Sequence, residues 1–159
     1  MNGLSVEALQ GFVRNPIFLS AFASWVISQT IKSFIEIIRR RPSSVRILLL
    51  HLFWATGGMP SSHTAVVTAL AASIGFVVGI DSAIFILALF FALITIRDSL
   101  GVRRAAGSQA IALNKVMHEL SVRFGIETRA VKEIRGHKAS EVSVGVLLGF
   151  FIASAFCNL

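Results

Sequence analysis

A run of 34 residues without Asp, Glu, Lys or Arg, from Ile47 to Ile80, is the feature that most constrains this chain. A membrane-spanning helix needs about 20 mostly apolar residues, and this run is interrupted by Gly57-Gly58 and Pro60. We interpret it as a short re-entrant stretch from Ile47 to Thr56, a tight loop, and a spanning helix from about Ser61 to Ile80.

Three further apolar runs predict three more spans. One covers Ile17 to Ile31 and keeps its apolar pattern to Ile38, ending before an Arg-Arg-Arg-Pro sequence. The others are Ser82 to Ile96 and Val142 to Leu159. Hydrophobic residues make up 55% of the chain and charged residues 14%, where a soluble domain carries roughly 25% charged residues. We therefore predict one domain, residues 1–159, that is an all-α polytopic membrane helix bundle of four spans.

The basic segment between Arg97 and Lys138 contains an amphipathic stretch. Its apolar residues recur at helical spacing: Leu113, Val116, Met117, Leu120 and Phe124. Lys115, Glu119 and Arg123 occupy the other side. We expect an amphipathic surface helix, lying on the membrane or against the bundle.

The net charge of +7 is carried by connections between apolar runs, which favours membrane topology and anionic lipid over nucleic acid as its explanation. Four arginines follow the first span and nine Lys or Arg follow the third, whereas the turn at Asp81 has none. By the positive-inside rule both basic connections are cytoplasmic and both termini lie outside. No basic region precedes the first apolar run, so we expect that run to be retained.

The sequence Gly57-Gly58-Met59-Pro60-Ser61-Ser62-His63 carries the first chemical signal. The glycines permit close backbone approach, and the proline and serines begin a helix. Free N–H groups at a helix N-terminus beside serine hydroxyls form an anion site. His63 is placed to exchange a proton with a bound anion. A capped helix start with a buried histidine is the alternative interpretation.

His137 and Glu141 are four residues apart, so on a helix they share a face. A carboxylate on one imidazole nitrogen selects the tautomer and leaves the other nitrogen as nucleophile or base. An ordinary ion pair at the start of a helix is the competing interpretation.

Basic side chains directly follow two of the apolar runs. Arg97, Asp98, Arg103 and Arg104 come after the third, and guanidinium groups bind phosphate oxygens in a bidentate fork. Asp98 is a candidate to hold one arginine in place, and a positive-inside anchor is the alternative. Gln109 and Asn114 follow and are interpreted as an exposed polar face in preference to support for the site.

Lys32 lies inside the first apolar run, where a charge is costly and indicates a functional site by default. Glu36, four residues on, is a structural partner that competes with this role. Two histidines, several arginines, this lysine and an anion-binding helix start all fall on one predicted membrane face. That combination suits phosphoryl transfer, in which catalysis is mostly positioning and charge stabilisation.

The segments that carry these groups resemble one family over nearly the whole chain. They are GGMPSSH (57–63), GVRRAAGSQA (101–110), ALN (112–114), GHKASEV (136–142) and GVLLG (145–149). Together they resemble the divergent branch of the type-2 phosphatidic acid phosphatase family, which is related to vanadium haloperoxidases and bacterial acid phosphatases. The resemblance implies a phosphatase that uses no metal or other cofactor.

The resemblance assigns the phosphate-binding groups. In the family's first motif, a lysine and an Arg-Pro pair bind phosphate, and Lys32 and Arg41 correspond, with a longer spacing. Arg39 restores the spacing but lacks the proline. The second motif, Pro-Ser-Gly-His, matches Pro60 to His63, with Ser62 where the family has glycine. This implies that the Ser61–Ser62 backbone holds phosphate and that His63 protonates the leaving group.

In the third motif the resemblance implies His137 as the nucleophile, with Glu141 where the family has aspartate. The family's arginine six residues before the nucleophile is replaced here by Val131. Another arginine would then take its place through space, with these candidates: Arg103, Arg104 and, less favoured, Arg135.

These observations predict a membrane enzyme that hydrolyses a phosphomonoester or pyrophosphate on a phospholipid or polyprenyl phosphate, with its site at the cytoplasmic face. The alternative is a non-catalytic lipid-phosphate binding or transport protein that retains the anion pocket. A haloperoxidase with bound vanadate is less favoured, because a membrane-embedded site suits lipid. A homodimer that completes a bundle of four spans is compatible with the sequence.

Overall fold

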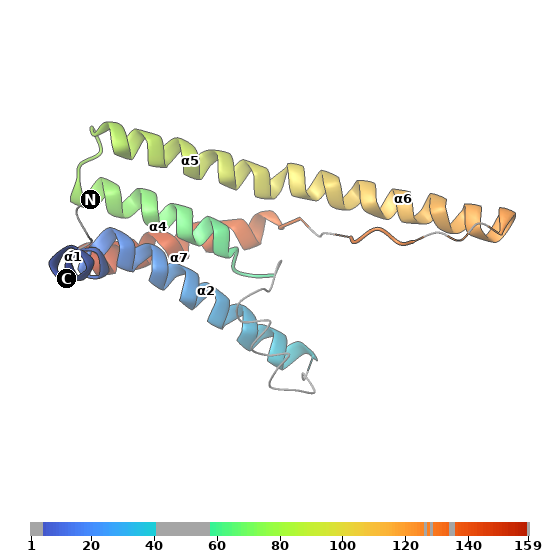
Figure 1. Ribbon diagram of the computed structural model, residues 1–159, viewed down its shortest axis with the longest axis horizontal. Coiled ribbons are helices and arrows are strands. Elements are labelled where there is room, and N and C mark those ends of the chain that lie inside the picture. Colours follow the sequence, from blue (N-terminus) through green and yellow to red (C-terminus); the bar gives the residue numbers. More distant parts are fainter. Residues whose placement is uncertain (1–4, 41–57, 126, 128, 134–135, 159) are drawn as a thin grey trace.

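The computed structural model describes residues 5–40, 58–125, 127, 129–133 and 136–158, without the side chains of Arg39, Arg40 and Arg103. These residues form six helices and no strand, which confirms the all-α prediction (Figure 1). The helices are α1 (Val6–Arg14), α2 (Pro16–Arg40), α4 (Ser62–Val77), α5 (Ala83–Leu100), α6 (Val102–Phe124) and α7 (Ala139–Asn158). The predicted re-entrant stretch, Ile47 to Thr56, lies outside the described residues.

Capping residues explain where the apolar helices begin and end. Ser61 is the N-cap of α4, and its hydroxyl accepts from the Thr64 N–H. Ser82 caps α5 in the same way. Between the two helices Gly79 adopts a φ of 107°, a conformation that L side chains rarely adopt. The predicted span from Ser61 to Ile80 is therefore shorter in the structure, because the chain turns at this glycine.

Helices α2, α4 and α7 pack against one another, and α5 packs on the remaining side of α4. The core is built mostly from alanine: Ala65, Ala69, Ala71, Ala88, Ala92 and Ala153 are buried, together with Val67, Ile74, Val142 and Ile152. The buried side of α2 is polar, with Ser20, Ser24 and Ser28 spaced four apart and leading to Lys32. Small side chains allow helices to approach closely, which is how helices associate in membranes.

The closest helix contact joins α4 and α7 through two glycines. A Cβ atom on Gly145 would lie 2.7 Å from the Ser61 carbonyl oxygen, and one on Gly149 would overlap the Ala65 carbonyl oxygen. Both obstacles are backbone atoms, which side-chain rotation cannot move. The GVLLG sequence is therefore a GxxxG contact that brings the two backbones together.

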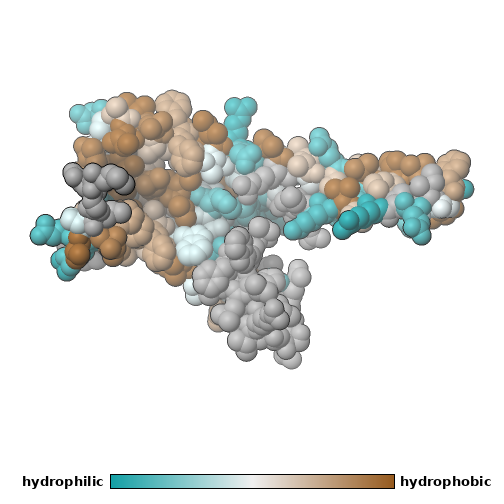
Figure 2. Space-filling view, in the orientation of Figure 1, coloured by the Kyte–Doolittle hydropathy of each residue, from teal (hydrophilic) through white to brown (hydrophobic). Residues whose placement is uncertain are grey.

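The outer surface of the bundle is apolar. On α5 the exposed large apolar side chains are Ile84, Ile86, Leu87, Leu89, Phe90, Phe91, Leu93 and Ile94. Figure 2 shows apolar side chains gathered over α5 and over the end of the bundle near α1. Among the described residues two helices are long and apolar enough to cross a membrane, the run of α5 into α6 and helix α7, and the shorter α4 is also apolar. The number of spans stays a prediction.

Helix α6 confirms the predicted amphipathic helix but not its placement against the bundle. It continues almost in line with α5 beyond Gly101 and extends away from the other helices (Figure 1). Among the described helices it contacts only α5. Gly125, with a φ of 66°, ends it, and the chain returns alongside α6 towards α7 (Figure 1). The sequence pattern predicted the helix because amphipathic spacing is local, whereas its direction depends on the junction at Gly101.

Replacing Gly149 by alanine should destabilise the bundle. The added methyl group meets the α4 backbone, so we expect a loss of about 1–3 kcal/mol, measured as a lower midpoint of thermal unfolding in detergent. Gly11→Ala in α1 is the matched control, because its Cβ meets nothing within 4 Å and alanine is the better helix former. Equal unfolding midpoints for the two variants would contradict the close α4–α7 contact.

Candidate functional site

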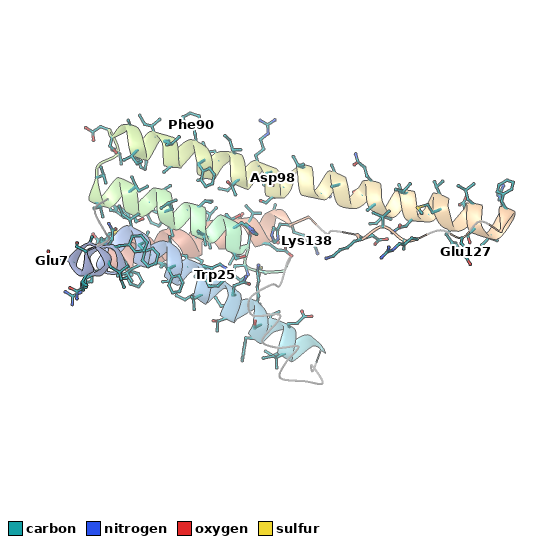
Figure 3. All side chains as sticks on the ribbon, viewed as in Figure 1. Glu7, Trp25, Phe90, Asp98, Glu127 and Lys138 are labelled. Atoms are coloured by element: carbon teal, nitrogen blue, oxygen red, sulfur yellow. The ribbon has the colours of Figure 1, made fainter. Side chains whose placement is uncertain are left out.

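The N-terminal ends of α4 and α7 meet at the edge of the bundle and bring together five predicted site residues: Ser61, Ser62, His63, His137 and Glu141. The Ser61 N–H donates to the Glu141 carbonyl oxygen at 3.0 Å, which links the start of one helix to the first turn of the other. Ser61, Ser62 and His137 are all buried there. In Figure 3, Lys138 marks this place at the start of α7, with the end of α4 beside it.

Lys32 connects a third helix, α2, to the N-terminal end of α4. Its Nζ donates to the Ser62 Oγ at 3.0 Å, and both side chains are buried, with 6% and 4% exposed. The two residues are 30 positions apart in the chain, so the contact is tertiary. Ser62 is the first residue of α4, and the N–H groups of a helix start have no partner within the helix. A buried ammonium, a hydroxyl and a helix N-terminus therefore converge on one point.

His137 lies just before α7 and is held by Glu141. Its Nδ1 is 2.9 Å from the Glu141 Oε2, and the imidazole is buried. The predicted pairing of these two side chains is thus present, although His137 precedes the helix by two residues. A proton on Nδ1 in this hydrogen bond leaves the lone pair on Nε2.

Glu141 also has a structural role. Its Oε2 accepts from the Lys138 N–H at 3.2 Å, and the Lys138 carbonyl accepts the first helical hydrogen bonds of α7. This is the reciprocal part of a capping box, in which a glutamate in the first turn satisfies the N–H of the capping residue. The helix start and the orientation of His137 therefore depend on the same carboxylate.

The charges of the three helices act on one another at this end. Glu141 attracts the Lys32 ammonium electrostatically, and the positive ends of the α4 and α7 dipoles lie nearby. The arrangement combines one cationic side chain and two helix N-termini with one carboxylate, which favours an anion. Among the described residues no group of three or more His, Cys, Asp or Glu side chains is arranged to hold a metal ion.

Both polar groups of Ser61 have partners within the fold. Its N–H is taken by the Glu141 carbonyl and its hydroxyl contacts the Thr64 N–H and Oγ1. The Ser61 N–H thus joins α4 to α7, and phosphate binding by the Ser61–Ser62 backbone stays a prediction. Ser62, one residue on, keeps the side-chain contact to Lys32.

His63, Arg104 and Asp98 lie around this centre at different depths. His63 is exposed on the first turn of α4, whereas His137 is buried. Arg104 is exposed at the start of α6, and its backbone touches Gly136, whose Cβ would lie 2.5 Å from the Arg104 Cα. Gly136 precedes His137, so the start of α6 is close to the imidazole. Asp98 lies in the last turn of α5, near the α5–α6 junction (Figure 3).

The side chains of four candidate arginines lie outside what the structure describes. Arg39 and Arg103 belong to α2 and α6, but their side chains are outside what the structure describes. Arg41 and Arg135 lie outside the described residues. The structure therefore describes one of the predicted arginine side chains of this site, that of Arg104.

Sequence reasoning missed the residues that hold the site together. Gly136 lies against Arg104, and Gly145 lies against Ser61 and Thr64. Of these contacts, only the one at Gly145 is indicated by the sequence, through the GxxxG spacing. Asn114 was interpreted as part of an exposed polar face, but its amide hydrogen-bonds Val131 and Glu133. No local pattern indicates such a contact, since its partners are 17 and 19 residues away.

Comparison with known proteins identifies the family of the chain. The Divergent PAP2 family matches residues 13–152. A Bacillus subtilis protein described as the uncharacterized membrane protein YuiD is 38% identical over 146 residues, which cover 84% of this chain and 89% of the relative. No solved structure matches the chain. The segments that suggested the family in the sequence lie within the matched range. The chain belongs to the divergent PAP2 family.

Proposed function

We propose that this protein is a membrane lipid phosphatase that hydrolyses a lipid phosphomonoester or pyrophosphate through a phosphoryl-histidine intermediate. The observation that carries the proposal is the meeting of two units at one end of the bundle. The Lys32–Ser62 pair forms a cationic site at a helix N-terminus, and the Glu141–His137 pair forms an oriented imidazole. The Ser61–Glu141 backbone hydrogen bond joins the two units directly.

The proposed reaction begins with phosphate oxygens on Lys32, on the Ser62 hydroxyl and N–H, and on Arg104. The lone pair of His137 Nε2 attacks phosphorus, and the bond from phosphorus to the leaving oxygen breaks. Glu141 stabilises the positive imidazole that forms. His63, exposed beside the helix start, gives its proton to the leaving oxygen.

Water completes the cycle. Its oxygen forms a bond to phosphorus, the phosphorus–nitrogen bond breaks, and the proton of the water returns to His63. Inorganic phosphate and a lipid with one phosphate fewer are released. Because the cations and the helix dipole are held by packing before substrate arrives, they stabilise developing charge without reorganisation.

Four helices serve as spans in this proposal: α2, α4, α5 and α7. The helix ends that carry the site lie on one side of the bundle, and the basic connections of the chain lie on that side too. By the positive-inside rule, this assigns the site to the cytoplasmic face and both termini to the outside. Helix α6 then extends from the membrane into the cytoplasm. A site at the level of the lipid headgroups suits a phosphate that remains attached to its lipid.

A binding or transport protein is the second candidate, and one observation favours it. Val131 stands where the wider family has an arginine, and here it is held against Asn114 through its backbone. The missing guanidinium would have to come from α6. An anion pocket without this charge would still bind a phosphate lipid.

Replacing His137 by alanine should abolish phosphate release, because no other group forms the covalent intermediate. The measurement is phosphate release by purified protein in detergent, with phosphatidate, phosphatidylglycerol phosphate and polyprenyl pyrophosphate as substrates. His118→Ala, an exposed histidine on α6, is the matched control. Turnover by His137→Ala would refute the mechanism. Lipid binding by the wild-type protein without turnover would support the binding candidate.

Replacing Lys32 by methionine should weaken binding of phosphate lipids with little loss of folding, because methionine keeps the apolar length of the side chain. A charge-assisted hydrogen bond contributes about 1.5–3 kcal/mol, so we expect a roughly tenfold to hundredfold higher dissociation constant. Lys115→Met removes an exposed lysine of α6 and should change binding little. Equal affinities of the two variants would exclude Lys32 from the phosphate site.

The topology predicts opposite labelling of two turns. With Cys157 replaced by serine, Glu127→Cys at the far end of α6 should react with an impermeant maleimide only after the cytoplasmic side is opened. Asp81→Cys, in the turn between α4 and α5, should react in intact cells. The reverse pattern would mean that the site faces outward.

A further inference from the structure

We propose that Asn114, on α6, is a positioning residue that holds the nucleophile His137 in place relative to the phosphate-binding Arg104. This inference rests on the proposed function. It follows from the path of the chain, which leaves the bundle along α6 and returns beside it before reaching His137 (Figure 1). The residues 129–133 of that return are called the return segment.

The Asn114 amide binds the return segment as a neighbouring strand would. Its Oδ1 accepts from the Val131 N–H at 2.8 Å, and its Nδ2 donates to the Val131 carbonyl oxygen at 2.9 Å. The second hydrogen of Nδ2 is used by the Glu133 Oε1, also at 2.9 Å. One side chain thus makes three hydrogen bonds, two of which pair the whole backbone unit of a single residue. This pairing selects one register of the return segment along α6.

A second contact lies closer to the site. The Gly136 Cα rests on the backbone of Arg104, where a Cβ would be 2.5 Å from the Arg104 Cα. Along α6 the two contact points are ten residues apart, about 15 Å at the rise of an α-helix. Along the return they are five residues apart, and five residues can span at most about 18 Å.

The return is thus attached to α6 at two points, at Val131 by the Asn114 amide and at Gly136 by the Arg104 backbone. His137 directly follows the second point, and Arg104 belongs to α6 itself. We therefore expect loss of the Asn114 contact to release the first point and to let His137 shift relative to the phosphate-binding Arg104.

The alternative is that Asn114 only stabilises the hairpin of α6 and its return. The two roles differ in what a broken contact does to catalysis. A purely stabilising contact changes the flexibility of the return segment and leaves turnover intact. A positioning contact lowers kcat more than it raises KM, because Lys32 and Ser62, on other helices, still bind the phosphate.

The test uses Asn114→Asp, which keeps the shape of the side chain and removes both donated hydrogens. The new carboxylate faces the Val131 carbonyl and the Glu133 carboxylate, so the contact becomes repulsive. We expect kcat for the best lipid substrate to fall about tenfold to a hundredfold, as for a displacement of about 1 Å at a reacting group. Gln109→Glu is the matched control, since it makes the same amide-to-acid change at an exposed position of α6.

A second substitution tests the contact by rescue. In Asn114→Asp with Glu133→Gln, the new amide can donate to the new carboxylate, and the net charge equals that of the wild type. In this double variant kcat should return most of the way to the wild-type value. The kcat of Glu133→Gln alone should stay close to wild type, because its amide oxygen still accepts a hydrogen bond from Asn114. Hydrogen exchange at residues 129–133 should quicken in Asn114→Asp and slow again in the double variant, while α2, α4 and α7 stay protected.

Each outcome separates the two proposals. Faster exchange in the return segment with unchanged kcat would overturn the positioning role and leave the phosphatase standing. Unchanged exchange in Asn114→Asp would overturn the contact itself. A wild-type protein without turnover of any lipid would refute the proposed function, and the positioning role would fall with it.

Discussion

The close approach of the α4 and α7 backbones is the contact on which the rest of the structure depends. Because Gly145 and Gly149 have no side chains, α7 packs directly on α4, and carbonyl groups of α4 occupy the space that side chains would fill. The approach aligns the two helix starts, so that the Ser61 N–H reaches the Glu141 carbonyl. Everything at the site is placed from this junction: Ser62 follows Ser61, and Glu141 holds His137. A bulkier interface would separate the cationic half of the site from the imidazole half.

The site also accounts for the polar groups inside an otherwise apolar bundle. A buried lysine is costly unless other groups stabilise it. Here a hydroxyl from α4 accepts its hydrogen bond, and the Glu141 carboxylate of α7 attracts it electrostatically. The three helices thus meet around a charge that none of them could bury alone. In the proposed reaction, the Lys32 ammonium would exchange these partners for phosphate oxygens when the substrate binds. The capping role of Glu141 keeps the imidazole oriented in either state.

Prediction from sequence succeeded where the signal was local. The apolar runs located α2, α4, α5 and α7, and Ser61 and Ser82 marked helix starts because a capping hydroxyl acts within three residues. The pairing of His137 with Glu141 was predictable for the same reason. The sequence did not indicate that the Ser61 N–H donates to a residue 80 positions away, or that the Asn114 amide binds the returning chain. Neither partner is marked by any spacing in the sequence.

The sequence by itself determined the class of the protein, the helices and the inventory of chemical groups, because hydrophobic runs, caps and motif residues act over short distances along the chain. Only the tertiary structure decided which groups meet. Two contacts join segments that are distant in the chain, the Lys32–Ser62 hydrogen bond and the packing of Gly136 on Arg104. The direction of α6 is likewise a property of the folded chain. Such contacts arise from packing, which depends on the shapes of both surfaces at once and cannot be predicted from either segment alone.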